Sequence, residues 1–138
     1  MQPILRPFAA AALALVLSVL PLATPLRADD PGAFEKIKID AGKALFEASC
    51  RRCHATDASD PSYGPVLEGV VGRKAGSMEG YPYSPALKGA GFVWTPGAMR
   101  AWMEDNDGLV PGTKMRHVGI EDPTVQDFIL AYLRTTGR

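Results

Sequence analysis

Apolar residues recur at the spacing of an α-helix near the end of the chain. They occupy positions i, i+3, i+4, i+7 and i+8, namely Val125, Phe128, Ile129, Tyr132 and Leu133. Side chains at this spacing lie on one face of a helix. Asp122-Pro123 comes just before them, and aspartate suits a helix cap while proline suits the first turn. The pattern therefore predicts a C-terminal helix that buries one face.

Two earlier segments carry the same kind of start signal. Ser84-Pro85 predicts a short helical turn, and Thr95-Pro96 predicts a longer helix. In the longer helix, an apolar stripe at i, i+3 and i+4 consists of Met99, Trp102 and Met103. We interpret this stripe as a core-facing surface, because methionine is a common filler of protein cores.

The first helix of the folded part is expected to begin at Asp40, which is a suitable N-cap. Apolar residues at helical spacing follow it, namely Ala41, Leu45 and Ala48. The preceding segment 29–39 is interpreted as a flexible N-terminal segment that frays. Residues 55–80 are rich in Gly, Ser, Pro and Asp, which predicts an irregular loop. With no alternating strand pattern, the sequence predicts an all-α fold.

The start of the chain has the three parts of a secretory signal peptide in their usual order. Arg6 supplies positive charge, residues 8–20 are almost entirely apolar, and residues 21–28 end in a small residue. The apolar part is about a dozen residues long, short of the ~20 that span a bilayer. We expect cleavage after Ala28, a periplasmic location and no stable membrane insertion afterwards. Because Leu26 is larger than the usual residue near a cleavage site, an uncleaved anchor stays open.

Length and charge limit the mature protein to one small domain without nucleic-acid-binding character. The chain has 138 residues, with 15 basic and 15 acidic side chains. Cleavage removes Arg6 and Arg27, which leaves 13 basic residues against the 15 acidic ones. A slightly acidic domain is not typical of nucleic-acid binding. A core of this size is marginal, so an enclosed apolar cofactor would contribute to stability.

The only two cysteines, Cys50 and Cys53, are followed directly by His54. This C-x-x-C-H pattern is typical of covalent attachment of a c-type haem. A short helical turn can direct both sulfurs at one porphyrin while the next residue reaches the iron. The alternatives are a disulfide, a zinc site and a thiol redox pair. Zinc needs two further ligands although only His117 remains, and a redox pair needs a βαβ context, so we favour haem.

The second axial ligand of such a haem decides between electron transfer and ligand chemistry. The candidates after the leader are one histidine and four methionines: His117, Met78, Met99, Met103 and Met115. Met99 and Met103 belong to the predicted core stripe, and Met78 lies in a loop that is expected to be exposed. Met115 follows residues 111–114, where proline and glycine hold an extended turn open between two helices. This rigid loop favours Met115.

The C-x-x-C-H pattern and the segment 111–115 together resemble the haem site and methionine loop of class I monohaem cytochromes c, of the mitochondrial and bacterial c2 type. Further matches extend along nearly the whole mature chain: Gly42, Phe46, Gly64-Pro65, Gly72-Arg73-Lys74, residues 80–84, Trp94 and Tyr132-Leu133. The resemblance implies a small cytochrome c fold over residues 40–138. This fold has three main helices, with loops wrapped around one covalently attached haem c.

The resemblance also implies how the haem is held. Cys50 and Cys53 would form its thioether bonds, His54 would be the proximal iron ligand, and Met115 the distal one. The carbonyl of Pro65 would accept a hydrogen bond from the axial histidine. A thioether ligand is soft, so it favours ferrous iron and raises the reduction potential relative to two histidines.

Three further residues are implied at the haem propionates, namely Arg73, Tyr83 and Trp94. Buried anions need a positive charge or a hydrogen-bond donor, which these side chains supply. Without the resemblance, the residues themselves favour simpler interpretations: a solvated charge, a surface aromatic and a core aromatic.

Three positions depart from the pattern of the family. Trp102 stands where a tyrosine usually bonds the methionine sulfur, and Leu87 replaces a common asparagine nearby. An indole N–H can donate a hydrogen bond, so the sequence leaves open whether Trp102 reaches the sulfur. His117 stands where an aromatic residue often shields the haem edge. We interpret it as an edge residue rather than an iron ligand, because Met115 has the matching loop.

The resemblance implies an electron carrier rather than an enzyme, which shuttles single electrons between redox proteins as a monomer. Docking would be transient and would use the haem edge. Basic residues that could line this edge are Arg51, Arg52, Lys114 and Arg116, but acidic residues precede the methionine loop, namely Glu104, Asp105 and Asp107. We therefore expect an electrostatic match that differs from the usual lysine ring. The alternative function is a haem sensor or peroxidase-like enzyme with a labile distal ligand.

Overall fold

The computed structural model describes residues 30–57, 59 and 62–137, so the predicted leader lies outside the described residues. Helices follow one another along this part: α1 (Pro31–Ser49), α2 (Pro85–Gly89), α3 (Pro96–Glu104), α4 (Asn106–Leu109) and α5 (Pro123–Leu133). No described helix is long and apolar enough to cross a bilayer. Within the described ranges, β-structure is limited to a single bridge. The prediction of an all-α fold with three main helices, α1, α3 and α5, is confirmed.

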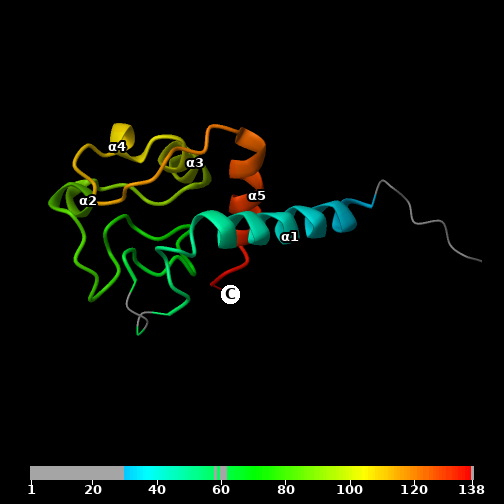
Figure 1. Ribbon diagram of the computed structural model, residues 1–138, viewed down its shortest axis with the longest axis horizontal. Helices are drawn as coiled ribbons and strands as arrows, with labels where there is room; N and C mark the ends of the chain where they lie inside the picture. Colours follow the sequence, from blue (N-terminus) through cyan, green and yellow to red (C-terminus); the bar gives the residue numbers. More distant parts are fainter. Residues whose placement is uncertain (1–29, 58, 60–61, 138) are drawn as a thin grey trace, which may run out of the picture.

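Helix α5 crosses the C-terminal half of α1, and the core of the protein begins at this crossing (Figure 1). Gly42 of α1 lies at the contact, where a Cβ atom would overlap the carbonyl oxygen of Phe128. Phe46, 1% exposed, packs against the ring of Tyr132 with centroids 5.4 Å apart. The packing of the first helix on the last, which the resemblance implies, is therefore present.

Three helix starts lie where the sequence predicts them. The side chains of Ser84, Thr95 and Asp122 accept hydrogen bonds from backbone amides in the first turns of α2, α3 and α5. In each case the next residue is a proline, whose fixed φ angle and missing N–H suit the first turn. Helix α4 was not predicted; Asp105 caps its single turn by accepting from the amide of Gly108 at 2.8 Å.

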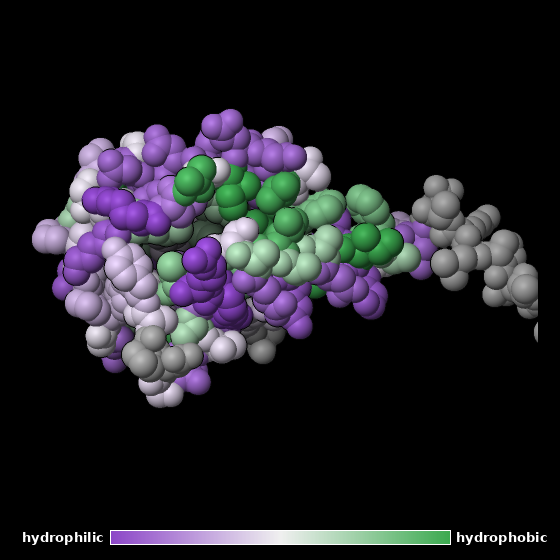
Figure 2. Space-filling model, in the orientation of Figure 1, coloured by the Kyte–Doolittle hydropathy of each residue, from purple (hydrophilic) through white to green (hydrophobic). Residues whose placement is uncertain are grey.

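The prediction that the first helix begins at Asp40 was wrong. The cap is Asp30, whose side chain accepts from the amide of Gly32 at 2.9 Å, and residues 31–39 continue as helix. Asp40 lies inside this helix and pairs with Lys36 one turn earlier at 2.5 Å. The first turns project away from the rest of the protein, with hydrophobic side chains along them (Figures 1 and 2). A cap and local ion pairs stabilise these turns. The composition of the segment did not indicate a helix.

The described residues between α1 and α2 are irregular, as predicted for residues 55–80. Part of this loop pairs with the segment before α3. The amide of Gly72 donates to the carbonyl of Trp94, and the amide of Trp94 donates to the carbonyl of Arg73, both at 2.9 Å. A bridge between Lys74 and Val93 continues the pairing. Arg73 and Trp94, far apart in sequence, are thereby held next to each other.

Candidate functional site

A cavity of about 900 Å³, including its open mouth, lies between the loops after α1 and helix α3. The face seen in Figure 2 is hollowed. Most of the residues predicted to bind a cofactor line this cavity, namely Cys50, His54, Pro65, Arg73, Tyr83, Trp94 and Met115. Its walls are mainly apolar, as is typical of small-molecule and cofactor sites. Cys53 is exposed beside the cavity.

His54 forms one wall and is 6% exposed. The turn after α1 delivers it, since the amide of His54 donates to the carbonyl of Cys50 at 3.0 Å. Its Nδ1 lies 2.7 Å from the carbonyl oxygen of Pro65. A carbonyl only accepts, so Nδ1 carries the proton and Nε2 keeps a lone pair. Burial lowers the pKa of His54, as does the nearby charge of Arg51, which favours the neutral ring. A Cβ atom on Gly64 would overlap the ring.

The two thiols differ in environment. Both cysteines are free, with Cys50 half-buried in the cavity wall and Cys53 exposed. Burial raises the pKa of the Cys50 thiol to about 11, against a smaller opposing effect of the charge on Arg51. At neutral pH Cys50 is therefore a neutral thiol in this environment.

Arg51, which the sequence analysis names as a candidate for the docking edge, is engaged within the protein. Its guanidinium pairs with Glu68 at 2.7 Å, and it lies 4.7 Å from the ring centroid of Phe46. The same group donates to the carbonyl of His54 at 3.2 Å. A guanidinium with several donors is well suited to hold a carboxylate and a backbone carbonyl together. Arg51 thus fixes the turn that carries the histidine rather than presenting a free charge.

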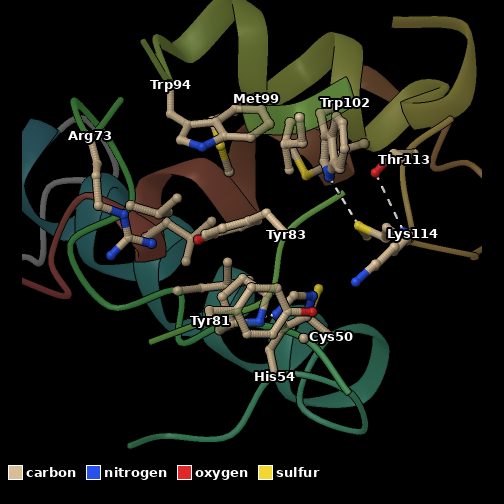
Figure 3. Close-up of a pocket in the computed structure, with 18 of the residues that line it drawn as sticks. Cys50, His54, Arg73, Tyr81, Tyr83, Trp94, Met99, Trp102, Thr113 and Lys114 are labelled. Atoms are coloured by element: carbon tan, nitrogen blue, oxygen red, sulfur yellow. Dashed lines mark hydrogen bonds between the residues drawn. The ribbon is translucent and has the colours of Figure 1, made fainter. Parts of the chain in front are cut away.

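Helix α3 forms the opposite wall. Figure 3 shows Trp94, Met99 and Trp102 on the other side of the cavity from Cys50 and His54. All three are buried, and the rings of Trp94 and Trp102 meet edge to face with centroids 5.1 Å apart. Met99 and Met103 both belong to the hydrophobic core, which confirms their interpretation as core residues.

The indole of Trp102 reaches the methionine sulfur, a question that the sequence leaves open. Its Nε1 donates to Sδ of Met115 at 3.0 Å (Figure 3). The second departure, Leu87, is 7% exposed and also lines the cavity, where it adds apolar surface. On the wall opposite the histidine, the indole of Trp102 therefore supplies a polar group that is directed at the sulfur, while Leu87 supplies apolar surface.

Hydrogen bonds from side chains to backbone carbonyls hold the methionine loop, residues 111–116, across the cavity mouth. Asn106 donates to the carbonyl of Met115 at 2.9 Å, and Tyr63 donates to the carbonyl of Lys114 at 3.0 Å. The ammonium of Lys114 donates in turn to the carbonyl of Pro82 at 2.5 Å. Sequence reasoning missed Asn106 and Tyr63. Asn106 follows a capping aspartate, which is a signal for a turn, whereas nothing in the sequence around Tyr63 indicates its contact.

The charged end of the cavity is built by Arg73 and Tyr83 beside Trp94 (Figure 3). The guanidinium of Arg73 donates to the carbonyl of Val66 at 3.0 Å and to that of Glu68 at 3.4 Å. These contacts hold the group at the wall and leave some of its donors free. Burial raises the pKa of Tyr83, and the charge of Arg73 partly offsets this, so the phenol stays a protonated donor.

A family model described as Cytochrome c matches residues 39–137. The chain belongs to the cytochrome c family. Cytochrome c2 of Rhodopila globiformis is 44% identical to it over 94 residues, which cover 68% of this chain and 89% of that protein. Cytochrome c-550 of Nitrobacter winogradskyi is 40% identical over 96 residues, covering 69% and 87%. The solved structure of cytochrome cH from Methylobacterium extorquens is 42% identical, with a TM-score of 0.65, and covers 71% of this chain and 98% of that one.

These matches place the chain among class I monohaem cytochromes c of the c2 type, which confirms the resemblance. They also support an electron-carrying role and one covalently attached haem c. The cavity fits that cofactor. It is apolar, with the Cys50 thiol and a histidine lone pair on one side, a thioether on the other and a guanidinium at one end, and the second free thiol, Cys53, lies beside it. A flat apolar ring with two anionic arms requires this combination.

Proposed function

We propose that the protein carries single electrons between redox proteins in the periplasm, with haem iron bound between Nε2 of His54 and Sδ of Met115. The observation that carries the proposal is the hydrogen bond from Trp102 to the sulfur, which orients Met115 toward the cavity opposite the histidine. Both candidate ligands are thus held by a hydrogen-bond partner. Such support of first-coordination ligands is characteristic of functional metal sites.

Covalent attachment is assigned to Cys50 and Cys53. Cys50 lies in the cavity wall, while Cys53 lies next to it on the outside of the same turn. Two thioether bonds would fix the ring against the end of α1. They would also keep His54 at its place, because the histidine follows Cys53 directly and its ring is confined by Gly64.

When bound, haem supplies an iron that changes between the ferric and ferrous states. The protein residues set the conditions for this change. A thioether on one side and an imidazole on the other would leave no open position for a substrate, and hydrogen bonds from Asn106 and Tyr63 hold the methionine loop. The apolar surroundings would limit the access of water to the iron.

Arg73, Tyr83 and Trp94 are assigned to the propionates. Arg73 and Trp94 lie together because the loop segment that contains Arg73 forms backbone hydrogen bonds with the segment that contains Trp94. A guanidinium, a phenol and an indole all donate hydrogen bonds, and a carboxylate can accept from each of them. We expect this end of the cavity to hold the anionic side of the haem.

Partner proteins would dock at the cavity mouth, beside the methionine loop. The basic groups there are partly engaged within the protein, since Lys114 donates to Pro82 and Arg116 pairs with Asp107 at 3.7 Å. Docking would therefore depend less on free positive charge than on shape and apolar contact. Such encounters are small and transient.

The experiment is an absorption spectrum of the purified haem protein in the ferric state. A methionine-iron charge-transfer band at neutral pH is the expected result, and Met115→Leu should lose it. A high-spin ferric spectrum, or ready binding of carbon monoxide by the ferrous wild type, would instead support the sensor or peroxidase alternative. The exported protein should have the mass of residues 29–138 plus one haem; retention of residues 1–28 would indicate an anchor.

A further inference from the structure

His117 carries a nitrogen that has no structural task in the described residues. Its Nδ1 lies 2.6 Å from the carbonyl oxygen of Val118. Because a carbonyl only accepts, the proton is on Nδ1 and the lone pair is on Nε2. Nε2 is shielded from solvent and has no hydrogen-bond partner among the described residues. A buried polar atom without a partner is unfavourable, so its position calls for an explanation.

The pattern of exposure along the chain groups His117 with Met115. From Met115 to Val118 the backbone forms neither helix nor turn, and exposure alternates. Met115 and His117 are half-buried, whereas Arg116 and Val118 are exposed, Val118 by 93%. In an extended chain, side chains two residues apart lie on one side.

The two histidines of the chain share one arrangement. In His54 and in His117, Nδ1 donates to a backbone carbonyl, at 2.7 Å and 2.6 Å, and Nε2 keeps its lone pair. Imidazoles that bind metals usually donate their other N–H to a carbonyl or carboxylate, which fixes the tautomer and makes the ligand more basic. His117 therefore has the hydrogen-bonded tautomer that is typical of a metal-binding histidine, although Met115 is the expected distal ligand.

We propose that Nε2 of His117 is a reserve ligand for the haem iron, which takes the distal position when the sulfur of Met115 is lost or displaced. This rests on the proposed binding of iron by His54 and Met115. In the exchange, the bond from the sulfur breaks and a bond from Nε2 forms, and no electron or proton is transferred. The site then stays closed to exogenous ligands, with a lower reduction potential, because imidazole stabilises ferric iron better than a thioether does.

Other side chains near the loop are less suited to this position. The side-chain nitrogen of Lys114 is bound to the carbonyl of Pro82. The guanidinium of Arg116 pairs with Asp107. Among these neighbours, His117 has a nitrogen without a hydrogen-bond partner among the described residues.

The test compares haem-containing Met115→Ala with Met115→Ala/His117→Phe, in which an aromatic side chain without nitrogen replaces the imidazole. Electron paramagnetic resonance and near-infrared magnetic circular dichroism separate bis-imidazole iron from high-spin iron. We expect low-spin bis-imidazole iron in the single variant, with a potential below wild type, and high-spin iron in the double variant. If His117 occupies about nine-tenths of the sites, azide should bind about tenfold more weakly to the single variant than to the double.

High-spin iron in Met115→Ala would overturn the proposal, and so would a low-spin signal that persists after the His117→Phe change. The double variant Met115→Ala/Lys114→Ala assigns such a persistent signal to lysine if it then disappears. Met115→Leu, which is close to methionine in volume, replaces Met115→Ala if the smaller side chain destabilises the loop. Loss of the methionine-iron band in the wild type would overturn the proposed function instead, so the two failures are distinguishable.

Discussion

Replacement of Trp102 by phenylalanine should lower the reduction potential of the haem. The indole N–H donates to the sulfur of Met115 at 3.0 Å, and phenylalanine has no donor. A hydrogen bond draws electron density from the sulfur and so weakens its donation to iron. Ferric iron needs this donation more than ferrous iron does, so the hydrogen bond favours the reduced state. Without it, the oxidised state gains in relative stability.

The size of the effect follows from the strength of the hydrogen bond. A typical protein hydrogen bond contributes about 0.5–1.5 kcal/mol, and sulfur is a weak acceptor, so about 0.5–1 kcal/mol is appropriate here. For a one-electron couple, about 59 mV corresponds to about 1.4 kcal/mol. The potential of Trp102→Phe should therefore fall by up to about 20–40 mV, and by less if the hydrogen bond is present in both oxidation states.

The assay is a spectroscopic redox titration of wild type and variants, with the methionine-iron band recorded to show that the sulfur stays bound. Trp102→Tyr is the matched control, because it shrinks the side chain but keeps a donor, and it should recover most of the loss. Met99→Leu alters the same wall without removing a donor and should leave the potential unchanged. An unchanged potential in Trp102→Phe, or an equal fall in Trp102→Tyr, would refute the role of the hydrogen bond.

Two glycines give further predictions. In Gly42→Ala the added Cβ overlaps the carbonyl of Phe128, so α1 and α5 must separate, and the free energy of unfolding should fall by about 1–3 kcal/mol or more in a denaturant titration. An effect below about 0.5 kcal/mol would contradict the close helix crossing. In Gly64→Ala the Cβ overlaps the ring of His54, which should displace the imidazole and weaken its bond to iron. Carbon monoxide binding should then increase, and wild-type behaviour would show that the loop adapts.

The sequence predicts helices well where the starting signal is local. Ser84, Thr95 and Asp122 each cap a helix with their own side chain, next to a proline, so a few residues decide the outcome. The same chemistry at Asp30 was overlooked, and Asp40 was preferred because apolar residues follow it. Amphipathic spacing indicates where a helix touches the core, but α1 continues for several turns beyond its contact with α5.

The site divides along the same line between local and distant contacts. The C-x-x-C-H pattern at residues 50–54 and the methionine loop are each one short continuous segment, so their chemistry can be predicted from the sequence. The union of Arg73 with Trp94 depends on backbone pairing between separated segments. The contact of Tyr63 with the methionine loop depends on two loops meeting across the cavity mouth. No local pattern contains such information, and only a family resemblance could suggest the first of them.

Of the three positions that depart from the pattern implied by the family resemblance, Trp102 and His117 would both act on the choice of distal ligand. Trp102 donates to the sulfur of Met115 and thus stabilises the thioether arrangement. An imidazole bound to iron through Nε2 has no lone pair left to accept from an indole N–H. Trp102 would therefore form no hydrogen bond with His117 in the distal position. If the proposed exchange takes place, the indole would favour the thioether as the first ligand. The apolar wall around it, to which Leu87 contributes, would keep water from competing with either ligand.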